Sequence, residues 1–420
     1  MPDQESNRAP SGSVKVCILT ETFYPVTGGG ETQARAIASG LAASGVAVHV
    51  ITRRSDKLLP RREFLGPVRL WRVRPTGPGQ FKKWGLVITA LIMLLRLRKS
   101  YDVILVCGFR ILGIPALIAA FWLRKPCLLK ADILGELSGE SFRAGLESAG
   151  LNPGNFILER LIGLRNRLLK RASGYVSIST AVESEYLACG IAHGQISRIP
   201  NSVDTDRFCP ADSFRKSCLR ERFGLEDDAK VAIYTGRLET TKGLPTLMAA
   251  WKKIAERHRN AHLLIVGSGD LGINNCAPEV RGFVTQHALD RCVTFTGSVD
   301  NVHEYLQASD FFIFPSEREA FGISVIEALA CALPVITTME GGLSDIVTPE
   351  RTAIVIPAGD AGALLLAIER AICGGVGLRK IASAGRELAV RRYSQAEVLG
   401  QYAAVLANLC EVGGASRPVL

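Results

Sequence analysis

Residues 311–335, FFIFPSEREAFGISVIEALACALPV, contain one copy of a strand, loop and helix pattern that recurs along the chain. The aromatic and β-branched run Phe311–Phe314 predicts a buried strand, and Val335 begins a second run of the same kind. A polar loop and an apolar helical stretch that starts near Gly322 lie between them. Because strands that alternate with helices build parallel sheets covered on both faces, this stretch predicts an α/β protein.

The same pattern recurs on both sides of residue 200. Predicted strands before it are Val14–Thr20, Val46–Thr52, Val68–Val73, Val103–Cys107, Pro126–Lys130, Tyr175–Ile178 and Ile196–Pro200. Predicted strands after it are Val231–Tyr234, Leu263–Val266, Val293–Phe295, Phe311–Phe314, Val335–Thr337 and Ile354–Ile356. Predicted helices are Glu31–Ala43, Lys82–Arg98, one opened by a capping box at Thr180–Glu183 and closed by Gly190, and Gln395–Leu409. We therefore expect two doubly wound parallel-sheet domains, residues 1–198 and 199–392, with a polar, disordered lead over residues 1–13.

Composition and charge limit the function. The chain has 420 residues with 47% apolar and 21% charged side chains, which excludes wholesale disorder. Residues 1–200 contain 27 basic and 14 acidic side chains, whereas residues 201–420 contain 23 and 26. Between Arg53 and Lys99, 13 basic residues face only Asp56 and Glu63. This asymmetry predicts an anionic partner for the first half: phosphate groups or a membrane surface, since no motif typical of nucleic-acid binding is present.

Apolar runs, cysteines and histidines bear on two further kinds of partner, a membrane and a metal ion. The apolar stretch Leu86–Leu95, flanked by basic residues and by Trp84, predicts either a helix that lies on an anionic bilayer or a buried helix with solvated ends. The longest apolar runs fall short of the roughly 20 residues that span a membrane. The 11 cysteines form no CxxC, and neither they nor the 6 histidines have the spacing of metal ligands. We expect reduced thiols, a cytoplasmic location and no metal.

Two carboxylates and two cations are the candidate chemical groups. Glu319 precedes the helix that starts near Gly322, and Glu327 lies just inside it. Helix N-termini suit phosphate and carboxylates accept hydroxyls, so the pair suggests a sugar on each side of a phosphate, whereas the alternative is two solvated charges. Arg237 and Lys242 lie in the loop YTGRLETTKGL, where they can bind a pyrophosphate or remain solvated.

Neither glycine-rich turn matches the dinucleotide fingerprint. The stretch IVGSGD, residues 265–270, lacks the third glycine of GxGxxG, and the spacing of Gly28–Gly30 also differs. A hydride-transfer enzyme is therefore disfavoured.

Taken together, six motifs resemble one family. They occur in the order GGxE, PNSVDTDRF, GRLxxxKG, VGSGD, TFTGSV and Glu-x7-Glu, between about Val14 and Tyr402. This order is similar to that of the family 4 glycosyltransferases, which are retaining enzymes of the GT-B fold, with two Rossmann-like domains that face a central cleft. The resemblance implies that the last helix, in residues 393–420, crosses back to the first domain, which is the acceptor side.

The resemblance also implies roles for individual residues. Arg237 and Lys242 match the cations that contact the donor diphosphate, and Glu319 and Glu327 match carboxylates near the donor sugar and the ribose. The remaining implied donor contacts are backbone N–H groups at Phe321, Gly322 and Ile323, a nucleobase site at Gly267, Ser298 and Val299, and phosphate contacts at Gly29 and Gly30. The nucleotide-sugar is a substrate, and no cofactor is implied.

The sequence departs from the family at two first-domain strands. Histidines that many relatives carry there are absent, and Asp132 or Glu136 either supplies hydrogen bonds instead or is structural. Asp204-Thr-Asp206 has the spacing of a metal-binding DxD, but its place in the linker predicts a turn.

We therefore expect a retaining hexosyltransferase that uses a nucleoside-diphosphate sugar and a lipid-linked or saccharide hydroxyl acceptor, in surface polysaccharide or glycolipid assembly. Its expected location is the cytoplasm or the inner face of the cell membrane, with contact through Arg53–Lys99 as one option. The alternatives are a sugar-nucleotide 2-epimerase and a non-catalytic protein that binds sugar nucleotides.

Overall fold

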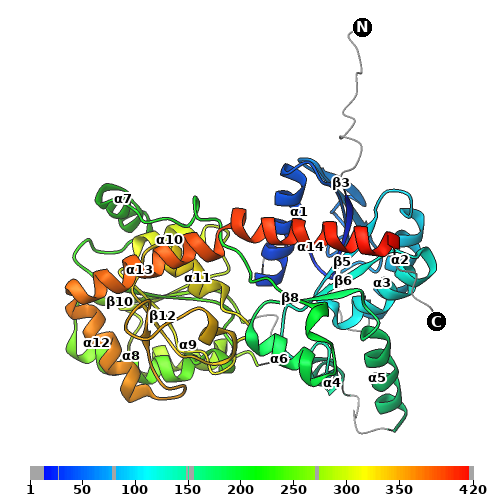
Figure 1. Ribbon diagram of the computed structural model, residues 1–420. Coiled ribbons are helices and arrows are strands. Elements are labelled where there is room, and N and C mark those ends of the chain that lie inside the picture. The colour runs from blue at the N-terminus through cyan, green and yellow to red at the C-terminus, as the bar shows by residue number, and fades with distance from the viewer. Residues whose placement is uncertain are drawn as a thin grey trace. The chain divides into compact units, whose positions relative to one another are not determined.

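The computed structural model describes residues 14–26, 28–77, 82–147, 150, 156–269 and 274–415 (Figure 1). The expected disordered lead, residues 1–13, lies outside the described residues. The chain divides into two compact units. Unit 1 contains Met1–Pro200 together with Val398–Leu420, and unit 2 contains Asn201–Glu397.

The described part of unit 1 is built on an eight-stranded sheet. Its strands are β1 (Lys15–Thr20), β2 (Ala47–Arg53), β3 (Arg62–Leu65), β4 (Val68–Val73), β5 (Val103–Cys107), β6 (Cys127–Lys130), β7 (Gly174–Ser177) and β8 (Ile196–Arg198). They are arranged in the order β3-β4-β2-β1-β5-β6-β7-β8. Every neighbouring pair is parallel except β3 and β4. Since β1 lies in the middle, the loop that follows it is at the centre of the carboxyl edge of the sheet.

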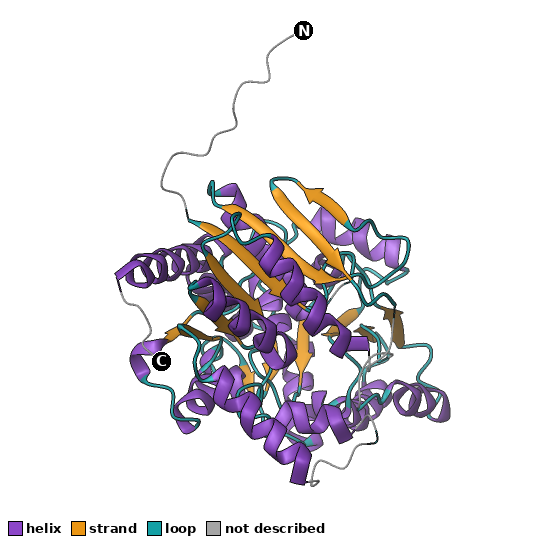
Figure 2. Cartoon of the chain, turned by 90° about the vertical axis from the view of Figure 1, so that its right-hand side faces the viewer, coloured by secondary structure: helices purple, strands orange, loops and turns teal. Residues whose placement is uncertain are grey.

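Helices pack against this sheet, as Figure 2 shows in purple beside the orange strands. They are α1 (Gly29–Ala43), α2 (Lys82–Arg96), α3 (Phe109–Leu123), α4 (Glu140–Glu147), α5 (Phe156–Leu169) and α6 (Thr180–Ala188). The final helix, α14 (Gln395–Ala415), starts in unit 2 and continues in unit 1. Its Val398, Tyr402 and Leu406 are buried in one hydrophobic cluster with residues of α1 and β1. Helix α14 therefore contributes buried apolar side chains to the hydrophobic core of unit 1.

Unit 2 is built on a six-stranded sheet in which every neighbouring pair is parallel. Its described strands are β9 (Lys230–Thr235), β10 (Ala261–Val266), β11 (Val293–Gly297), β12 (Phe311–Phe314), β13 (Val335–Thr337) and β14 (Ile354–Val355), in the order β11-β10-β9-β12-β13-β14. Its helices are α7 (Ser213–Phe223), α8 (Leu244–Arg257), α9 (Ala277–Gln286), α10 (Val302–Ala308), α11 (Ile323–Ala330), α12 (Ala361–Cys373) and α13 (Val376–Tyr393). From β9 the chain adds strands first on one side, β10 and β11, and then on the other side, starting with β12. The strand order therefore reverses between β9 and β12, and ligands bind at the carboxyl ends of the strands at such a reversal point.

The predicted α/β fold with two parallel-sheet domains is confirmed, with two local corrections. Strand β3 is antiparallel and was not predicted, because its four residues include charged Arg62 and Glu63 and it reaches β4 through a tight turn at Gly66. The predicted capping box at Thr180 is wrong by one residue. Ser179 caps α6 instead, because its hydroxyl accepts the N–H of Val182.

Helix α2 is mainly a core helix. Its Leu86, Ala90 and Leu94 are buried, and it packs against α3. Its Ile88 and Ile92 are exposed on the opposite side, whereas the side chain of Trp84 lies outside the described residues. Among the described helices, none is long and apolar enough by itself to cross a bilayer; α12 and α13 together reach that composition but are bent by 100°.

Candidate functional site

Three glycines end adjacent strands at the carboxyl edge of unit 2. Gly236 follows β9, Gly267 follows β10 and Gly297 ends β11, and all three have positive φ angles. Gly236 donates its N–H to the carbonyl of Val266 at 3.0 Å, and Gly267 donates to Gly297 at 2.9 Å. A Cβ on Gly267 would lie 1.9 Å from the carbonyl oxygen of Gly236, so only glycine fits there. The turns are thereby packed backbone against backbone, which leaves their outer side open.

A pocket of about 200 Å³ lies on this open side. Its lining residues are Leu238, Gly267, Ser268, Gly269, Ala277, Arg281, Gly297 and Ser298. Of the three residues predicted around a nucleobase, Gly267 and Ser298 line the pocket, while Val299 is not among the lining residues. The sequence reasoning missed Leu238 and Arg281. Leu238 directly follows Arg237 in the GRL motif, whereas Arg281 is one of many helical arginines and gives no signal of its own.

Lys242 and Glu319 are brought together although they lie 77 residues apart. The ammonium of Lys242 is 2.7 Å from Oε2 of Glu319 and donates to the carbonyl of Arg318 at 3.3 Å. Both side chains are largely buried, at 12% and 14% exposure. A predicted phosphate cation and a predicted sugar carboxylate therefore form one ion pair, at the carboxyl ends of β9 and β12.

The backbone around Glu319 is fixed by neighbouring loops. The N–H of Glu317 donates to Thr241 at 2.9 Å, and the N–H of Gly342 donates to the carbonyl of Glu319 at 2.9 Å. A Cβ on Gly341 would lie 2.1 Å from that same carbonyl oxygen, and Gly341 has a φ of 58°. The sequence reasoning missed Gly341 and Gly342, although a Gly-Gly pair soon after a predicted strand is a turn signal.

Arg237 lies in the same loop as Lys242 but points to a different partner. Its guanidinium is 2.7 Å from Oε1 of Glu239, and its side chain is 60% exposed. The hydroxyl of the buried Tyr234 donates to the carbonyl of Arg237 at 2.8 Å, which fixes the backbone there. The exposed guanidinium is accessible to an incoming anion, while the buried carboxylate of Glu239 holds it from the other side.

Glu327 stands apart from the Lys242–Glu319 pair. It lies in α11, which begins at Ile323 after Gly322, whose φ is 112°. Phe321 is buried against Tyr393. Burial raises the pKa of Glu327 to about 8, and the opposing effect of Arg207 is smaller. A carboxyl group of this kind is mostly protonated near pH 7 and has no hydrogen-bond partner in the described part of the chain. It can therefore form hydrogen bonds with the hydroxyl groups of a ligand.

In unit 1, the predicted glycine loop lies beside Asp132. Gly29 and Gly30 are the first residues of α1, directly after the loop that follows β1. A Cβ on Gly30 would be 3.2 Å from Oδ2 of Asp132, and one on Gly108, after β5, would be 3.0 Å from it. Asp132 also forms an ion pair with the fully buried Lys130. The carboxylate of Asp132 therefore lies at the carboxyl edge of the unit 1 sheet. It is beside the two strand ends at which the expected histidines are absent.

Glu136 is buried and faces inward. Its two carboxylate oxygens accept the N–H groups of Arg110 at 3.1 Å, Asp132 at 3.1 Å and Ile133 at 3.3 Å. Burial, with a smaller contribution from Asp132, raises the pKa of Glu136 to about 7 against these hydrogen bonds. The geometry gives Glu136 a positioning role, because it connects the start of α3 to the loop that contains Asp132.

The linker motif forms a turn. Oδ1 of Asp204 accepts the N–H groups of Asp206 at 3.2 Å and Arg207 at 3.1 Å. Within the described ranges, no group of three or more His, Cys, Asp or Glu side chains has the arrangement of a metal site.

Comparison with known proteins identifies this arrangement. Residues 27–207 match the model described as Glycosyltransferase Family 4, and residues 229–373 match the one described as Glycosyl transferases group 1. The chain is a family 4-like glycosyltransferase. It is therefore an enzyme, a hexosyltransferase, as the sequence predicted.

One relative and two solved structures are similar to this glycosyltransferase along most of its length. It is 26% identical over 369 residues to an uncharacterized glycosyltransferase of Methanocaldococcus jannaschii, across 86% of this chain and 89% of the relative. Its structure resembles a sucrose-phosphate synthase from Thermosynechococcus elongatus, with a TM-score of 0.77, 24% identity and 96% and 100% of the two chains covered. It also resembles Anabaena HepE in complex with UDP-glucose, with a TM-score of 0.74, 21% identity and 94% and 99% coverage. The structural likeness establishes the GT-B fold.

Proposed function

We propose that this glycosyltransferase moves a hexose from a nucleoside-diphosphate sugar to a hydroxyl group of a saccharide or lipid-linked acceptor, with retention of anomeric configuration. The single observation behind the proposal is the ion pair of Lys242 with Glu319, 2.7 Å apart at the carboxyl edge of unit 2. One partner suits a diphosphate and the other suits sugar hydroxyls, and a nucleotide-sugar joins these two groups by one bond.

In the proposed reaction, the bond between the anomeric carbon and the diphosphate oxygen breaks. A bond from the acceptor oxygen forms on the same face of the sugar while the proton of the acceptor hydroxyl passes to the departing diphosphate oxygen, and a nucleoside diphosphate leaves. Negative charge grows on the diphosphate, so Lys242 and Arg237 would stabilise the transition state more than the ground state. Glu319 would orient the sugar by accepting hydrogen bonds from its hydroxyl groups, and the ion pair with Lys242 would hold the Glu319 side chain in place.

The glycine turns support the nucleotide part of the proposal. The pocket of about 200 Å³ beside Gly267 and Ser298 is small, and its lining is mostly glycine and serine backbone with Leu238 and Arg281. A flat base can approach such a backbone closely, while Arg281 is held over the ring of Phe295 at 4.3 Å. We place the ribose by Glu327, whose carboxyl group has no hydrogen-bond partner among the described residues. HepE, the relative in complex with UDP-glucose, has the same fold.

We assign the acceptor to unit 1, near Gly30 and Asp132. We also propose that the reaction needs no divalent metal, because Lys242 and Arg237 supply positive charge to the diphosphate. A pathway that builds surface polysaccharide or glycolipid at the inner face of the membrane accords with the basic stretch Arg53–Lys99 and with Ile88 and Ile92 exposed on α2.

Transfer assays on substituted chains test the proposal. Glu319→Ala, Arg237→Ala and Lys242→Ala should each lower kcat about 100- to 1000-fold, because each removes a contact to the reacting diphosphate or sugar. Matched controls are Glu317→Ala, an exposed carboxylate of the same loop, and Lys253→Ala, an exposed lysine of α8. Both controls should retain full activity, in the presence of EDTA as well.

The product reports the stereochemistry. Proton NMR of the new glycoside should show the anomeric configuration of the donor. An inverted product would refute retention, and full turnover by Glu319→Ala and Lys242→Ala would refute the proposed site. Interconversion of the donor without any acceptor would instead identify an isomerase.

A further inference from the structure

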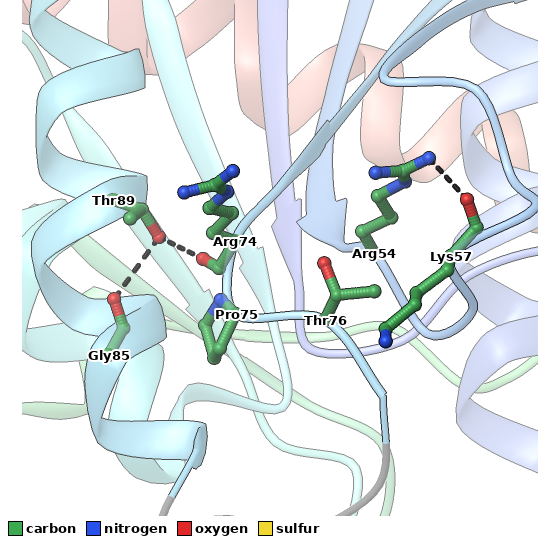
Figure 3. Close-up of a pocket in the computed structure, with 7 residues that line it drawn as sticks. All are labelled: Arg54, Lys57, Arg74, Pro75, Thr76, Gly85 and Thr89. Carbon is green, nitrogen blue, oxygen red and sulfur yellow. Dashed lines mark hydrogen bonds between the residues drawn. The ribbon is translucent and has the colours of Figure 1, made fainter.

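A second pocket lies within unit 1. It has a volume of about 590 Å³, within the usual size of ligand pockets. Figure 3 shows the residues that line it: Arg54, Lys57, Arg74, Pro75, Thr76, Gly85 and Thr89. Three of the seven are cations and none is a carboxylate, so the charge of the lining suits an anion.

The sheet itself brings two of these cations together. Arg54 is the first residue after β2 and Arg74 is the first after β4. The two strands are parallel, with Arg53 opposite Val73, and the N–H of Arg54 donates to the carbonyl of Val73 at 2.9 Å. Both arginines therefore leave the sheet at its carboxyl edge. Strand β2 neighbours β1, so the pocket opens on the same edge as the loop before Gly29.

The positive charge in the pocket is uncompensated. The side chain of Arg54 donates to two carbonyls, those of Leu59 at 2.7 Å and Lys57, which fixes its guanidinium but leaves its charge unpaired. Lys57 and Arg74 form no ion pair with any described residue. The nearby Asp56 is exposed and accepts the N–H of Leu58 at 2.8 Å. Three unpaired cations around one cavity repel one another, and this is relieved when an anion binds.

The wall opposite the Arg54 turn is formed by α2. The hydroxyl of Thr89 donates to the carbonyl of Arg74, with the carbonyl of Gly85 also within reach at 3.2 Å. Gly85 packs close to Pro75, where a Cβ would be 3.5 Å from the proline ring. In Figure 3, Thr76 lies between Arg74 on one side and Arg54 with Lys57 on the other. The backbone of Arg74 is thus held by the helix, and its guanidinium extends freely.

We propose that this pocket binds a phosphoryl group on the acceptor. Two guanidinium groups and an ammonium suit a phosphate, which arginine can bind through two parallel N–H···O bonds and lysine as a point charge. This inference rests on the proposed function, because it is the transferase activity that requires an acceptor. The phosphoryl group belongs to a soluble sugar or polyol phosphate, or to a phosphate-containing lipid.

Titration of the whole chain tests the phosphoryl site directly. Glucose 6-phosphate and inorganic phosphate should bind saturably, at least tenfold more tightly than glucose. Arg74→Gln and Lys57→Gln should weaken the phosphate affinity roughly tenfold or more each, because each removes a charged hydrogen bond. The matched control is Arg98→Gln, which removes the same charge from an exposed site of unit 1 outside the pocket and should leave the affinity unchanged.

A vesicle arm distinguishes the two sources of phosphate. Binding to phosphatidylglycerol vesicles that Arg74→Gln weakens, and that inorganic phosphate competes away, supports a lipid-borne phosphoryl group. Tight binding of glucose 6-phosphate without vesicle binding supports a soluble one. The proposal is overturned if phosphate binds no better than glucose, or if Arg74→Gln and Arg98→Gln weaken it equally.

A nucleotide titration on the same samples keeps this test separate from the proposed function. Arg74→Gln should bind nucleoside diphosphates as tightly as the unsubstituted chain, because their proposed site is in unit 2. If no nucleotide binds while phosphate binding still depends on Arg74, the proposed transferase site fails and the phosphate pocket stands. The reverse result leaves the transferase site intact and overturns the pocket.

Discussion

At the scale of single residues, buried ionisable groups give the sharpest predictions. Glu327 has a pKa of about 8 because burial disfavours its ionised form. Lys130 is fully buried, which alone lowers the pKa of its ammonium, but Asp132, Cys107 and Glu136 together outweigh that effect and raise the pKa. Ionisation of Glu327 therefore costs free energy, whereas the charged ammonium of Lys130 is stabilised by its acidic neighbours.

Glu327 should make stability depend on pH. Its pKa is higher in the folded chain than in the unfolded one, so the folded state binds the proton more tightly. The stabilisation is fully present below about pH 4.5 and is lost as the pH rises through about 8. Relative to Glu327→Gln, the unsubstituted chain should lose about 4 kcal/mol of its free energy of unfolding between pH 5 and pH 8.5. Urea unfolding at both pH values measures this, and an unchanged difference between the two chains would refute it.

Asp132 should stabilise unit 1 through Lys130. Asp132→Asn leaves a buried ammonium without its counter-ion, which should lower the free energy of unfolding by about 3–5 kcal/mol. The double variant Lys130→Met with Asp132→Asn should recover most of that loss, because it removes the buried charge. Urea titration of the three chains checks both results. A double variant no more stable than Asp132→Asn would show that the ion pair is not the cause.

At the scale of elements, the glycine turns after β9, β10 and β11 determine what the edge of unit 2 can bind. Gly267→Ala places a methyl group 1.9 Å from the carbonyl oxygen of Gly236 at a φ of 138°. We expect this variant to lose at least tenfold in affinity for nucleoside diphosphate and about 1–3 kcal/mol in stability. The control Gly282→Ala introduces the same methyl group in helix α9, where nothing lies within 4 Å.

Thermal melts with and without nucleotide separate the two variants. Gly282→Ala should melt at or above the temperature of the unsubstituted chain, since alanine favours helices. It should also keep the shift that nucleotide produces. Equal shifts for Gly267→Ala and Gly282→Ala would show that the glycine turns do not shape the nucleotide site.

Sequence patterns at this scale predicted strands better than helix starts and polar networks. The β12 and β13 bounds follow from the sequence because both strands are short, fully buried runs of aromatic and β-branched residues. Strand β3 does not, since only its pairing with β4 stabilises its charged residues. Likewise, the sequence places Lys242 and Glu319 in loops after predicted strands, whereas their contact depends on the parallel order of β9 and β12. The role of Gly341 behind Glu319 follows only from the fold.

At the scale of the whole molecule, part of the excess positive charge of the first half lies around one pocket. The basic excess of residues 1–200 includes Arg54, Lys57 and Arg74, which the fold gathers around one pocket of unit 1. Unit 2 contains the cations predicted for the donor, Arg237 and Lys242, and one of these is already paired with the carboxylate predicted for the sugar. We infer a division of labour in which unit 2 binds the nucleotide-sugar and unit 1 binds the acceptor.

Calorimetric titration of the whole chain with UDP-, GDP- and ADP-sugars tests the central claim most directly. The account predicts that at least one of them binds saturably, that Lys242→Ala weakens that donor at least tenfold, and that Lys253→Ala leaves its affinity unchanged. The account is contradicted if none of the nucleotide-sugars binds, or if Lys242→Ala binds the donor as tightly as the unsubstituted chain.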